Sequence, residues 1–210
     1  MKKIIFVFVV SLSIAFLGCK SEEKKEETKE VSKSEEKKST AAFAVANASN
    51  IISFTAYKTT EKVPVVGEFK KVKIITGGEG NTVKEAINGT AFSVPISSLA
   101  TKDASRDLKI KTYFFEKMVG TDALTGYFQI NDDTSGVVKL TMNDVAKDVP
   151  FTYTIVDKTF TMQATIDIND WNASAALASL NKVCEVLHTG ADGVSKTWSE
   201  VALNITSTFQ

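Results

Sequence analysis

The feature that most restricts the fold of this chain is an alternation of apolar and polar residues with a period of two. It is clearest in FTMQATIDI, residues 160–168, where every second side chain from Phe160 to Ile168 is apolar. A period of two is typical of a β-strand with one buried and one solvated face. Residues 149–155 follow the same pattern, and a short polar turn at 157–159 separates the two segments. Together they predict an antiparallel hairpin.

The same reasoning predicts eight strands in all. A second hairpin turns near Asn143-Asp144, and Gly67 marks a predicted bend or bulge within a long strand. The predicted strands cover residues 50–57, 63–76, 86–96, 123–130, 136–142, 149–155, 160–168 and 198–209. Short turns between successive strands favour an all-β fold with short helices, arranged as an up-and-down antiparallel eight-stranded β-barrel without exposed edges. A barrel of eight strands can enclose one small ligand.

Two segments depart from this period and predict short helices. Residues 103–112 follow a cluster of helix-capping side chains at Ser98, Thr101 and Asp103. The second helix lies within 172–190, before the last strand. Its apolar side chains recur with helical spacing, at Ala173, Ala176, Leu177, Leu180, Cys184 and Leu187.

The N-terminus is typical of a bacterial lipoprotein. Two lysines precede an apolar run, 4–17, which is the length of a signal-peptide core and short for a membrane-spanning helix. The run ends at Leu17-Gly18-Cys19, which resembles a lipobox, with Phe16 where leucine is usual. We therefore expect removal of the signal peptide, 1–18, and lipid attachment at Cys19. The alternative is an ordinary secretory signal in which the cysteine is coincidental.

Residues 19–44 are expected to form a lipidated, charged and flexible tether. Seven Lys and seven Glu fall within 20–39, and this composition cannot bury a core. Acidic residues directly after the lipidated cysteine resemble the surface-export signals of some lipoproteins, although a simple spacer is an equal alternative. We expect a location in the bacterial cell envelope, anchored to the outer membrane on its periplasmic face or at the cell surface.

The remaining residues, 45–210, suffice for one domain with a proper core. Over 41–210 there are 16 Lys and Arg against 18 Asp and Glu, and Arg106 is the single arginine. This balance argues against a nucleic-acid partner.

Cys184 and His188, the one histidine of the chain, stand four residues apart on the second predicted helix. A closed zinc site needs four ligands, and the sequence offers no further Cys or His for one. A Cys–His nucleophile needs an oxyanion hole and an orienting group, and no recognisable spacing supplies them. We therefore predict no catalytic residue, no metal and no cofactor, and expect Cys184 to pack as a small hydrophobe.

The order of these segments resembles the YceI-like family. The resemblance covers about 45–206 and rests on ISFTAY…VVGEFKKV, SRDLKIKTYFF and GVVKLTMNDVAKDVPFTYTI. It includes the pairs Gly67/Phe69, Arg106/Asp107 and Phe114/Phe115, although the Arg-Asp segment is shorter than in the family and lacks its usual histidine. The segment 180–201 looks like a lipoprotein branch of the family.

This resemblance implies a lipocalin-like barrel, generally not an enzyme, that binds a polyisoprenoid or another long apolar lipid for storage or transport. Large aromatic and thioether side chains suit an apolar tail, and Arg106 suits a polar head group at the cavity mouth. The expected ligand-binding residues are Phe54, Tyr57, Phe69, Phe92, Arg106, Phe114, Phe115, Phe128, Phe151, Tyr153, Phe160, Met162 and Trp171.

Two alternatives remain open at this point. The aromatic side chains equally fit a barrel with a filled core, which would make this a structural or interaction lipoprotein without a small ligand. An enzyme using Cys184 and His188 is the less favoured reading. For Arg106, the simpler expectation is an ion pair with Asp103 or Asp107 at the start of the helix.

Overall fold

The computed structural model describes residues 40–210, and the predicted signal peptide, Cys19 and the tether up to residue 39 lie outside the described residues. Residues 40–210 lie in one compact unit that contains its own hydrophobic core. A segment with a complete core of its own is expected to fold in isolation, and it is called the barrel domain below.

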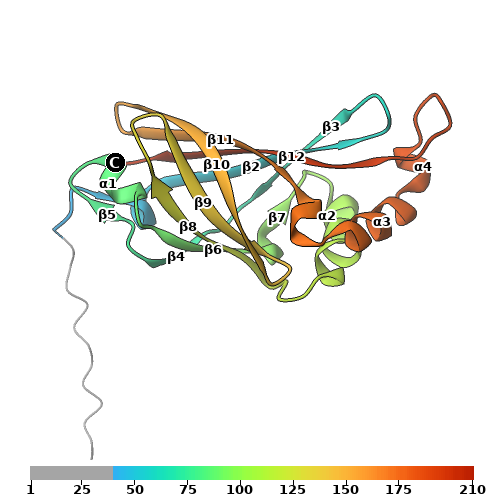
Figure 1. The fold of residues 1–210 in the computed structure, drawn as a ribbon, viewed down its shortest axis with the longest axis horizontal. Coiled ribbons are helices and arrows are strands. Elements are labelled where there is room, and N and C mark those ends of the chain that lie inside the picture. The colour runs from blue at the N-terminus through green and yellow to red at the C-terminus, as the bar shows by residue number, and fades with distance from the viewer. Residues whose placement is uncertain (1–39) are drawn as a thin grey trace, which may run out of the picture. The chain divides into compact units, whose positions relative to one another are not determined.

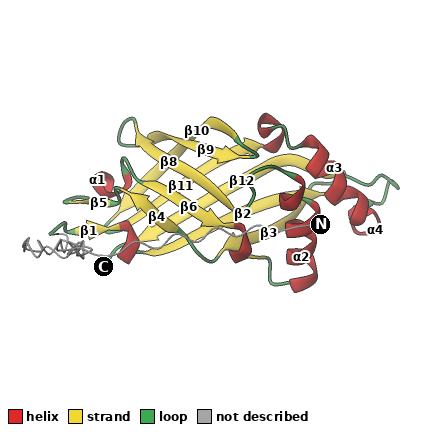
Figure 2. Ribbon diagram, turned by 90° about the horizontal axis from the view of Figure 1, so that it is seen from below, coloured by secondary structure: helices red, strands yellow, loops and turns green. Residues whose placement is uncertain are grey.

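The barrel domain is built on a curled antiparallel sheet, as Figures 1 and 2 show, and the predicted fold class is confirmed. Neighbouring strands of the main sheet follow the order β4-β6-β8-β9-β10-β11-β12-β2-β3-β7, and β1 pairs with β5 in a small second sheet. The strands are β1 (Phe43–Ala44), β2 (Ser49–Lys58), β3 (Val63–Phe69), β4 (Lys73–Thr76), β5 (Glu79–Gly80), β6 (Ala91–Pro95), β7 (Leu99–Ala100), β8 (Ala123–Ile130), β9 (Ser135–Met142), β10 (Val145–Val156), β11 (Thr159–Asp167) and β12 (Thr197–Thr208).

The strands at the two ends of this sheet come from the same two chain segments, which pair with each other twice. The segment 63–76 contains β3 and β4, and the segment 91–100 contains β6 and β7. Phe69 pairs with Leu99 at one end, and Lys73 pairs with Ser93 at the other. Counted by segments, the wall is therefore a ring of eight antiparallel strands, interrupted at 70–72 and at the short turn Ile96–Ser98.

The helices gather mainly at one end of the barrel, beside the outer parts of β2, β3 and β12 (Figure 1). They are α2 (Ala104–Tyr113), α3 (Ser174–Val183) and α4 (Glu185–His188), whereas α1 (Val83–Ile87) lies at the other end near β5. Asp103 caps α2 by accepting a hydrogen bond from the backbone N–H of Arg106 at 3.1 Å. The helix predicted over 103–112 is thus found within one residue at each end.

The sequence-based assignments fail in three places. Ala86 and Ile87 belong to α1 rather than to a strand, because Thr82 caps a helix there by accepting from the N–H of Glu85. The helix predicted within 172–190 breaks at Cys184, so α3 and α4 are separate and Leu187 is exposed. The long strand 63–76 is interrupted at 70–72, beyond Gly67.

Gly67 is needed for packing, because a phenylalanine ring covers it. Gly67 stands opposite Phe54 on the neighbouring strand, and a Cβ atom at Gly67 would overlap that ring. The same arrangement recurs where Gly126 faces Phe92 and where Gly136 faces Phe151. Aromatic side chains across from strand glycines cover the exposed backbone and fill the space that the missing side chain leaves. In each pair the ring lies against the barrel wall.

We expect Gly67→Ala to lower the free energy of unfolding by about 1–3 kcal/mol, since the added methyl group overpacks the Phe54 ring. Chemical denaturation of the barrel domain measures this change. In a Phe54→Leu background, which removes the ring, the same substitution should cost distinctly less. An equal cost in both backgrounds would show that the ring is not what excludes a side chain at Gly67.

Candidate functional site

The barrel encloses a series of adjoining cavities along its length. The inner chamber, between β2, β8, β9, β11 and β12, has a volume of about 110 Å³. The middle chamber, of about 120 Å³, lies under α2 and α3. The two share the lining residues Phe54, Phe69, Leu124, Met142, Ile166 and Leu203. The two chambers therefore adjoin in the barrel interior, and together they are called the apolar path below.

The polar side chains that line the inner chamber form hydrogen bonds within the protein. Ser207 donates to Asn50 Oδ1 at 2.6 Å, and Asn50 donates to the carbonyl oxygen of Val45 at 2.9 Å. Thr90 donates to the carbonyl oxygen of Ala86 at 2.7 Å, and Ser53 donates to that of Asn204 at 2.9 Å. A wall whose polar groups already have partners offers a ligand mainly apolar contact, which suits a hydrocarbon.

The path continues into a third cavity, called the mouth, with a volume of about 210 Å³. It lies between the outer parts of β2, β3 and β12 on one side and α2, α3 and α4 on the other. It shares Ala56, Ile110, Leu180 and Thr197 with the middle chamber. Exposed Ser105 and Leu187 lie on its rim, so the mouth opens to solvent.

Ten of the thirteen predicted ligand-binding residues line this path. The inner or middle chamber contains Phe54, Phe69, Phe92, Phe114, Phe115, Phe128, Phe160 and Met162, and the mouth contains Tyr57 and Arg106.

The other three predicted residues do not line the chambers or the mouth. Phe151 covers Gly136, Tyr153 donates to the carbonyl oxygen of Asp132 at 2.6 Å, and Trp171 donates to that of Leu140 at 3.0 Å. Each is buried in the core but does not line the inner or the middle chamber; Phe151 packs on the Phe128 ring, which does, with ring centroids 5.8 Å apart. Sequence reasoning selected aromatic side chains by size, which does not show whether a buried ring borders a void.

The same reasoning missed the aliphatic lining and two of the mouth's cations. Leu124, Met142, Ile166 and Leu203 lie where the inner and middle chambers meet. Their positions on the apolar face of each strand were the available signal. Lys58 and Lys109 line the mouth, and nothing in the sequence pattern distinguishes them from other lysines.

Arg106 has both of the roles considered for it. Its guanidinium lies 3.7 Å from the carboxylate of Asp103, so the expected ion pair is present, and the same side chain lines the mouth. Asp107 instead accepts hydrogen bonds from the backbone N–H and the hydroxyl of Thr101, at 2.7 and 2.6 Å. The two neighbouring residues therefore have different roles. Asp107 fixes the entry to α2, and Arg106 lines the mouth.

Cys184 and His188 do not form a nucleophile–base pair in the structure. His188 Nδ1 lies 2.6 Å from the hydroxyl of Thr197, and that hydroxyl donates to Asn181 Oδ1 at 2.7 Å. Because the hydroxyl has one proton to donate, it accepts from Nδ1–H, which leaves Nε2 unprotonated. Among residues 40–210, no hydrogen bond joins the imidazole to Cys184, and burial raises the pKa of the thiol.

The surroundings of His188 hold its imidazole neutral. Burial, and after it the nearby cations Lys58, Lys109 and Arg106, together lower its pKa from 6.5 to about 4. The same three cations oppose the effect of burial on the thiol of Cys184. The mouth is therefore a region of positive potential around one neutral imidazole.

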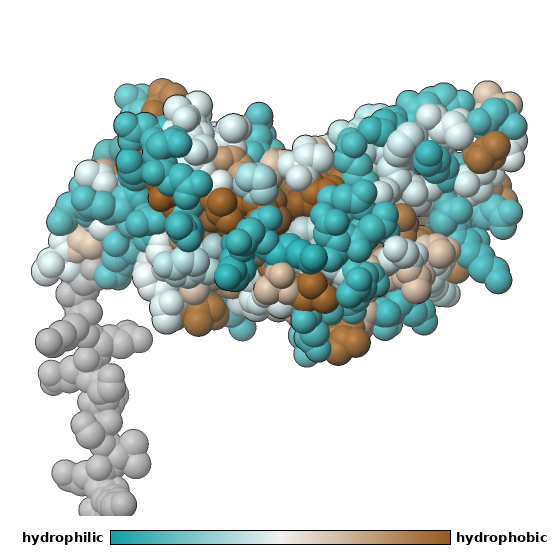
Figure 3. Space-filling view, viewed as in Figure 1, coloured by the Kyte–Doolittle hydropathy of each residue, from teal (hydrophilic) through white to brown (hydrophobic). Residues whose placement is uncertain are grey.

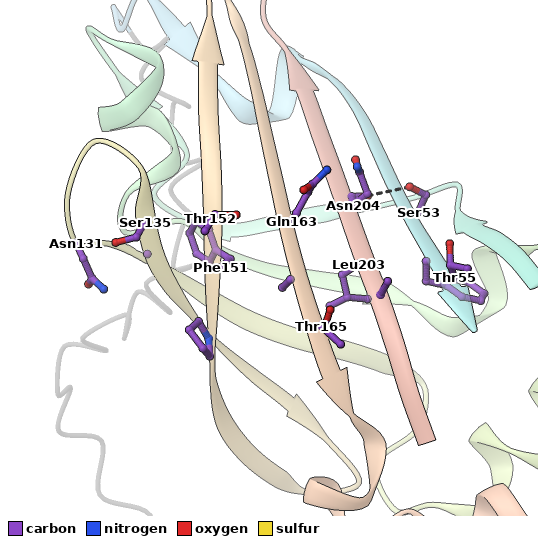
Figure 4. Close-up of a pocket in the computed structure, with 15 residues that line it drawn as sticks. Ser53, Thr55, Asn131, Ser135, Phe151, Thr152, Gln163, Thr165, Leu203 and Asn204 are labelled. Carbon is purple, nitrogen blue, oxygen red and sulfur yellow. Dashed lines mark hydrogen bonds between the residues drawn. The ribbon is translucent and has the colours of Figure 1, made fainter. Parts of the chain in front are cut away.

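A separate, wide hollow of about 780 Å³ lies on the outer face of the sheet (Figure 4). Uncharged polar side chains such as Thr152, Gln163, Thr165 and Asn204 stand across it. Its polar lining and open shape match the solvated face of a twisted sheet. Figure 3 shows a mostly hydrophilic surface, with apolar residues visible between the hydrophilic ones.

Two further features are absent from the described part of the chain. Residues 40–210 contain no group of three or more His, Cys, Asp or Glu side chains arranged to hold a metal ion. They also contain no helix long and apolar enough to cross a membrane.

Comparison with known proteins agrees with this architecture. The model of the YceI-like domain matches residues 35–209. The chain belongs to the YceI-like family. No curated protein matches the sequence.

Among solved structures, this YceI-like chain is similar to a polyisoprenoid binding domain from Saccharophagus degradans implicated in plant cell wall breakdown. The TM-score is 0.57 and the identity 12%, over 81% of this chain and 98% of that domain. It is also similar to BcnA of Burkholderia cenocepacia, with a TM-score of 0.51 and 15% identity over 79% and 98% of the two chains. At these identities the likeness shows a shared fold.

The lowered pKa of His188 predicts a pH-dependent stability. The unfolded chain binds a proton at this histidine as the pH falls through 6.5, whereas the folded chain does so only near 4. The free energy of unfolding should therefore fall as the pH is lowered through this window.

Chemical denaturation of the barrel domain and of a His188→Gln variant, at several values between about pH 7 and pH 4.5, tests this expectation. The variant should lose less stability over the window, because the carboxylates contribute equally in both proteins. Identical slopes for the two proteins would show that His188 titrates normally in the folded state.

Proposed function

We propose that this protein is a lipid-anchored carrier of the bacterial cell envelope, whose barrel binds a polyisoprenoid or another long apolar lipid for storage or transport. The observation that carries the proposal is the apolar path through the inner and middle chambers, whose polar groups already have partners. Membership of the YceI-like family and the fold shared with a polyisoprenoid binding domain support it.

The cavities together are large enough for a small ligand, and flexible side chains border them. The inner chamber, the middle chamber and the mouth together reach the lower part of the usual range of small-molecule pockets, roughly 300–1,000 Å³. Met142 and Met162 border the inner chamber, and flexible thioether side chains rearrange readily around an apolar guest. A long tail would enter with its end in the inner chamber and its head toward the mouth.

The proposed activity is binding without covalent chemistry. Burial keeps the Cys184 thiol protonated by raising its pKa, and a protonated thiol is a poor nucleophile. His188 is directed to Thr197 instead of to this thiol. The alternative function is a structural or interaction lipoprotein with a filled barrel, and the small volumes of the two inner chambers are the observation in its favour.

Native mass spectrometry separates the carrier from the filled barrel. We expect the barrel domain, exported to the periplasm and purified without harsh detergent, to carry a discrete extra mass. Denaturation should release this mass, and organic solvent should extract it. A domain without extra mass that also stays unchanged after incubation with isoprenoid lipids would instead support the filled-barrel interaction protein.

A blocking substitution locates the bound molecule. Leu203→Trp places a large ring where the inner and middle chambers meet, so it should reduce lipid retention about ten- to hundredfold. Val156→Trp adds the same ring at an exposed position on β10 and should leave retention unchanged. Equal retention by both variants would place the lipid outside the barrel.

Lipid anchoring is tested independently on the full chain. Wild-type protein expressed in a bacterium should partition into the detergent phase and incorporate labelled fatty acid, because acyl chains on Cys19 would provide most of its membrane affinity. Cys19→Ser should abolish the labelling and move the protein to the aqueous phase, while Cys184→Ser should change neither. Unlabelled wild-type protein would indicate an ordinary secretory signal.

A further inference from the structure

Exposed apolar side chains lie beside the opening of the mouth, at the helical end of the barrel. Val186 and Leu187 of α4 are 89% and 57% exposed, and Leu108 of α2 is 65% exposed. Such side chains are ordinary when they stand singly, but a group of them marks an interaction surface. The group is called the apolar rim and consists of Leu108, Val183, Val186, Leu187 and Val194.

Four members of the apolar rim lie on one short piece of chain. Val183, Val186 and Leu187 fall within five consecutive residues where α3 passes into α4. The loop that follows folds back as a tight turn, since the backbone N–H of Gly190 donates to the carbonyl oxygen of Val194 at 3.0 Å. Val194 is thereby held close to the end of α4.

Leu108 lies near the same piece of chain because α2 and α4 both border the mouth. Lys109, the next residue to Leu108, lines the mouth together with Leu187. Figure 1 shows α2, α3 and α4 at one end of the barrel, far from α1 and the C-terminus. The apolar rim is therefore confined to the end at which the barrel interior opens.

Cations stand beside the apolar rim within the mouth. The charged residues that line the mouth are Lys58, Arg106, Lys109 and Asp103. The ammonium of Lys58 donates to the carbonyl oxygen of Leu187 at 3.0 Å, which joins a cation directly to the rim. The exposed carboxylates of Glu185 and Asp192 lie on the outer segment, so the excess of positive charge is confined to the mouth. Exposed hydrocarbon next to cations complements a lipid surface with anionic head groups.

The opening of the apolar path favours a lipid bilayer as the partner. The middle chamber meets the mouth at Ala56, Ile110 and Leu180, and Leu187 continues the apolar surface from the mouth to the outside. A lipid tail that left the mouth into water would lose the free energy of burial for each of its methylene groups. Contact between the rim and a bilayer removes the intervening water, so the tail passes from one apolar environment to the other.

We propose that the apolar rim is a membrane-docking surface, which holds the mouth against a lipid bilayer while a lipid enters or leaves the barrel. This inference rests on the proposed function and concerns how the ligand is exchanged. The rim side chains insert among the head groups and the upper acyl chains, and the cations of the mouth contact lipid phosphates. Docking is weak and reversible, because the inserted apolar surface is small.

Vesicle binding in the absence of the lipid anchor tests this surface. The barrel domain, which lacks Cys19, is mixed with vesicles of phosphatidylethanolamine that contain phosphatidylglycerol as the minor component, and flotation measures the bound fraction. Val186→Glu should reduce the partition coefficient about tenfold or more, because it places a charge on the most exposed residue of the rim. Since the Val186 side chain has little packing to lose, the variant should fold normally.

Val156→Glu is the matched control. Val156 is an exposed valine at the end of the barrel that holds the C-terminus, since it pairs with Thr159 and Thr159 pairs with Thr208. The same substitution there should leave vesicle binding unchanged. Equal losses in the two variants would indicate general repulsion from anionic lipid and overturn the docking surface.

Tryptophan substitutions report whether the rim enters the bilayer. The fluorescence of Val186→Trp should be quenched by vesicles with brominated acyl chains more strongly than that of Val156→Trp. Both variants retain the native Trp171 and Trp198, so a difference between them belongs to the added ring. Equal quenching would show that the rim does not insert, and would overturn the proposal.

Lipid retention separates this proposal from the proposed function. Val186→Glu should retain lipid in native mass spectra, because Val186 does not line the path, but should take up lipid from vesicles about tenfold more slowly. A domain that retains lipid without binding vesicles would overturn the docking surface alone. A wild-type dimer that Val186→Glu separates into monomers would also overturn it, by assigning the rim to a second copy. A domain that binds vesicles but never carries lipid would instead contradict the proposed function.

Discussion

The pairing of phenylalanine rings with glycines across adjacent strands is the constraint on which the interior of this barrel depends. Phe54 and Phe92 each lie over a glycine that admits no Cβ atom, so their rings stay flat against the wall. The same two rings border the apolar path. Were they to point at the barrel axis, little space would remain for a guest, since eight strands enclose an interior only just wide enough for side chains. Aromatic rings therefore line the barrel interior without filling it.

The two ends of the path differ in how their polar groups are satisfied. Inside, each hydroxyl or amide is bonded to another part of the protein, and a hydrocarbon meets no unpaired donor. At the mouth, cations from β2 and α2 stand beside a neutral imidazole that Thr197 holds in one tautomer. This division of polarity is what an amphiphile requires. Cys184 and His188, although close in sequence, have separate surroundings, because the thiol is buried and the imidazole is bonded to Thr197.

The fold could be predicted to a large extent because its period-two segments are long and bounded by clear turns. The turns at Asn143-Asp144 and near Asp157 have the positive φ values of tight hairpins. Where the assignments failed, a local interaction prevailed over the pattern, as with the cap of α1 at Thr82. The site was less accessible to sequence reasoning. Alternation tells which face of a strand is buried, but whether Phe160 or Phe151 borders a void depends on neighbours from other strands. Likewise, Lys58 and Lys109 meet only because β2 and α2 come together in three dimensions.

The interruption in the wall has a mechanical consequence. Residues 70–72 and the turn Ile96–Ser98 lie outside the strands, so the regular strand-to-strand hydrogen bonds stop between them. One backbone hydrogen bond, from the N–H of Lys70 to the carbonyl oxygen of Ser98 at 3.0 Å, spans the break. Elsewhere, parting two strands means breaking a run of ladder bonds. The ring thus has one seam at which its circumference can change at small cost. Tails of different thickness would be accommodated there, by expansion of the wall at a fixed place, while the opposite side of the barrel, formed by β10, β11 and β12, keeps its register.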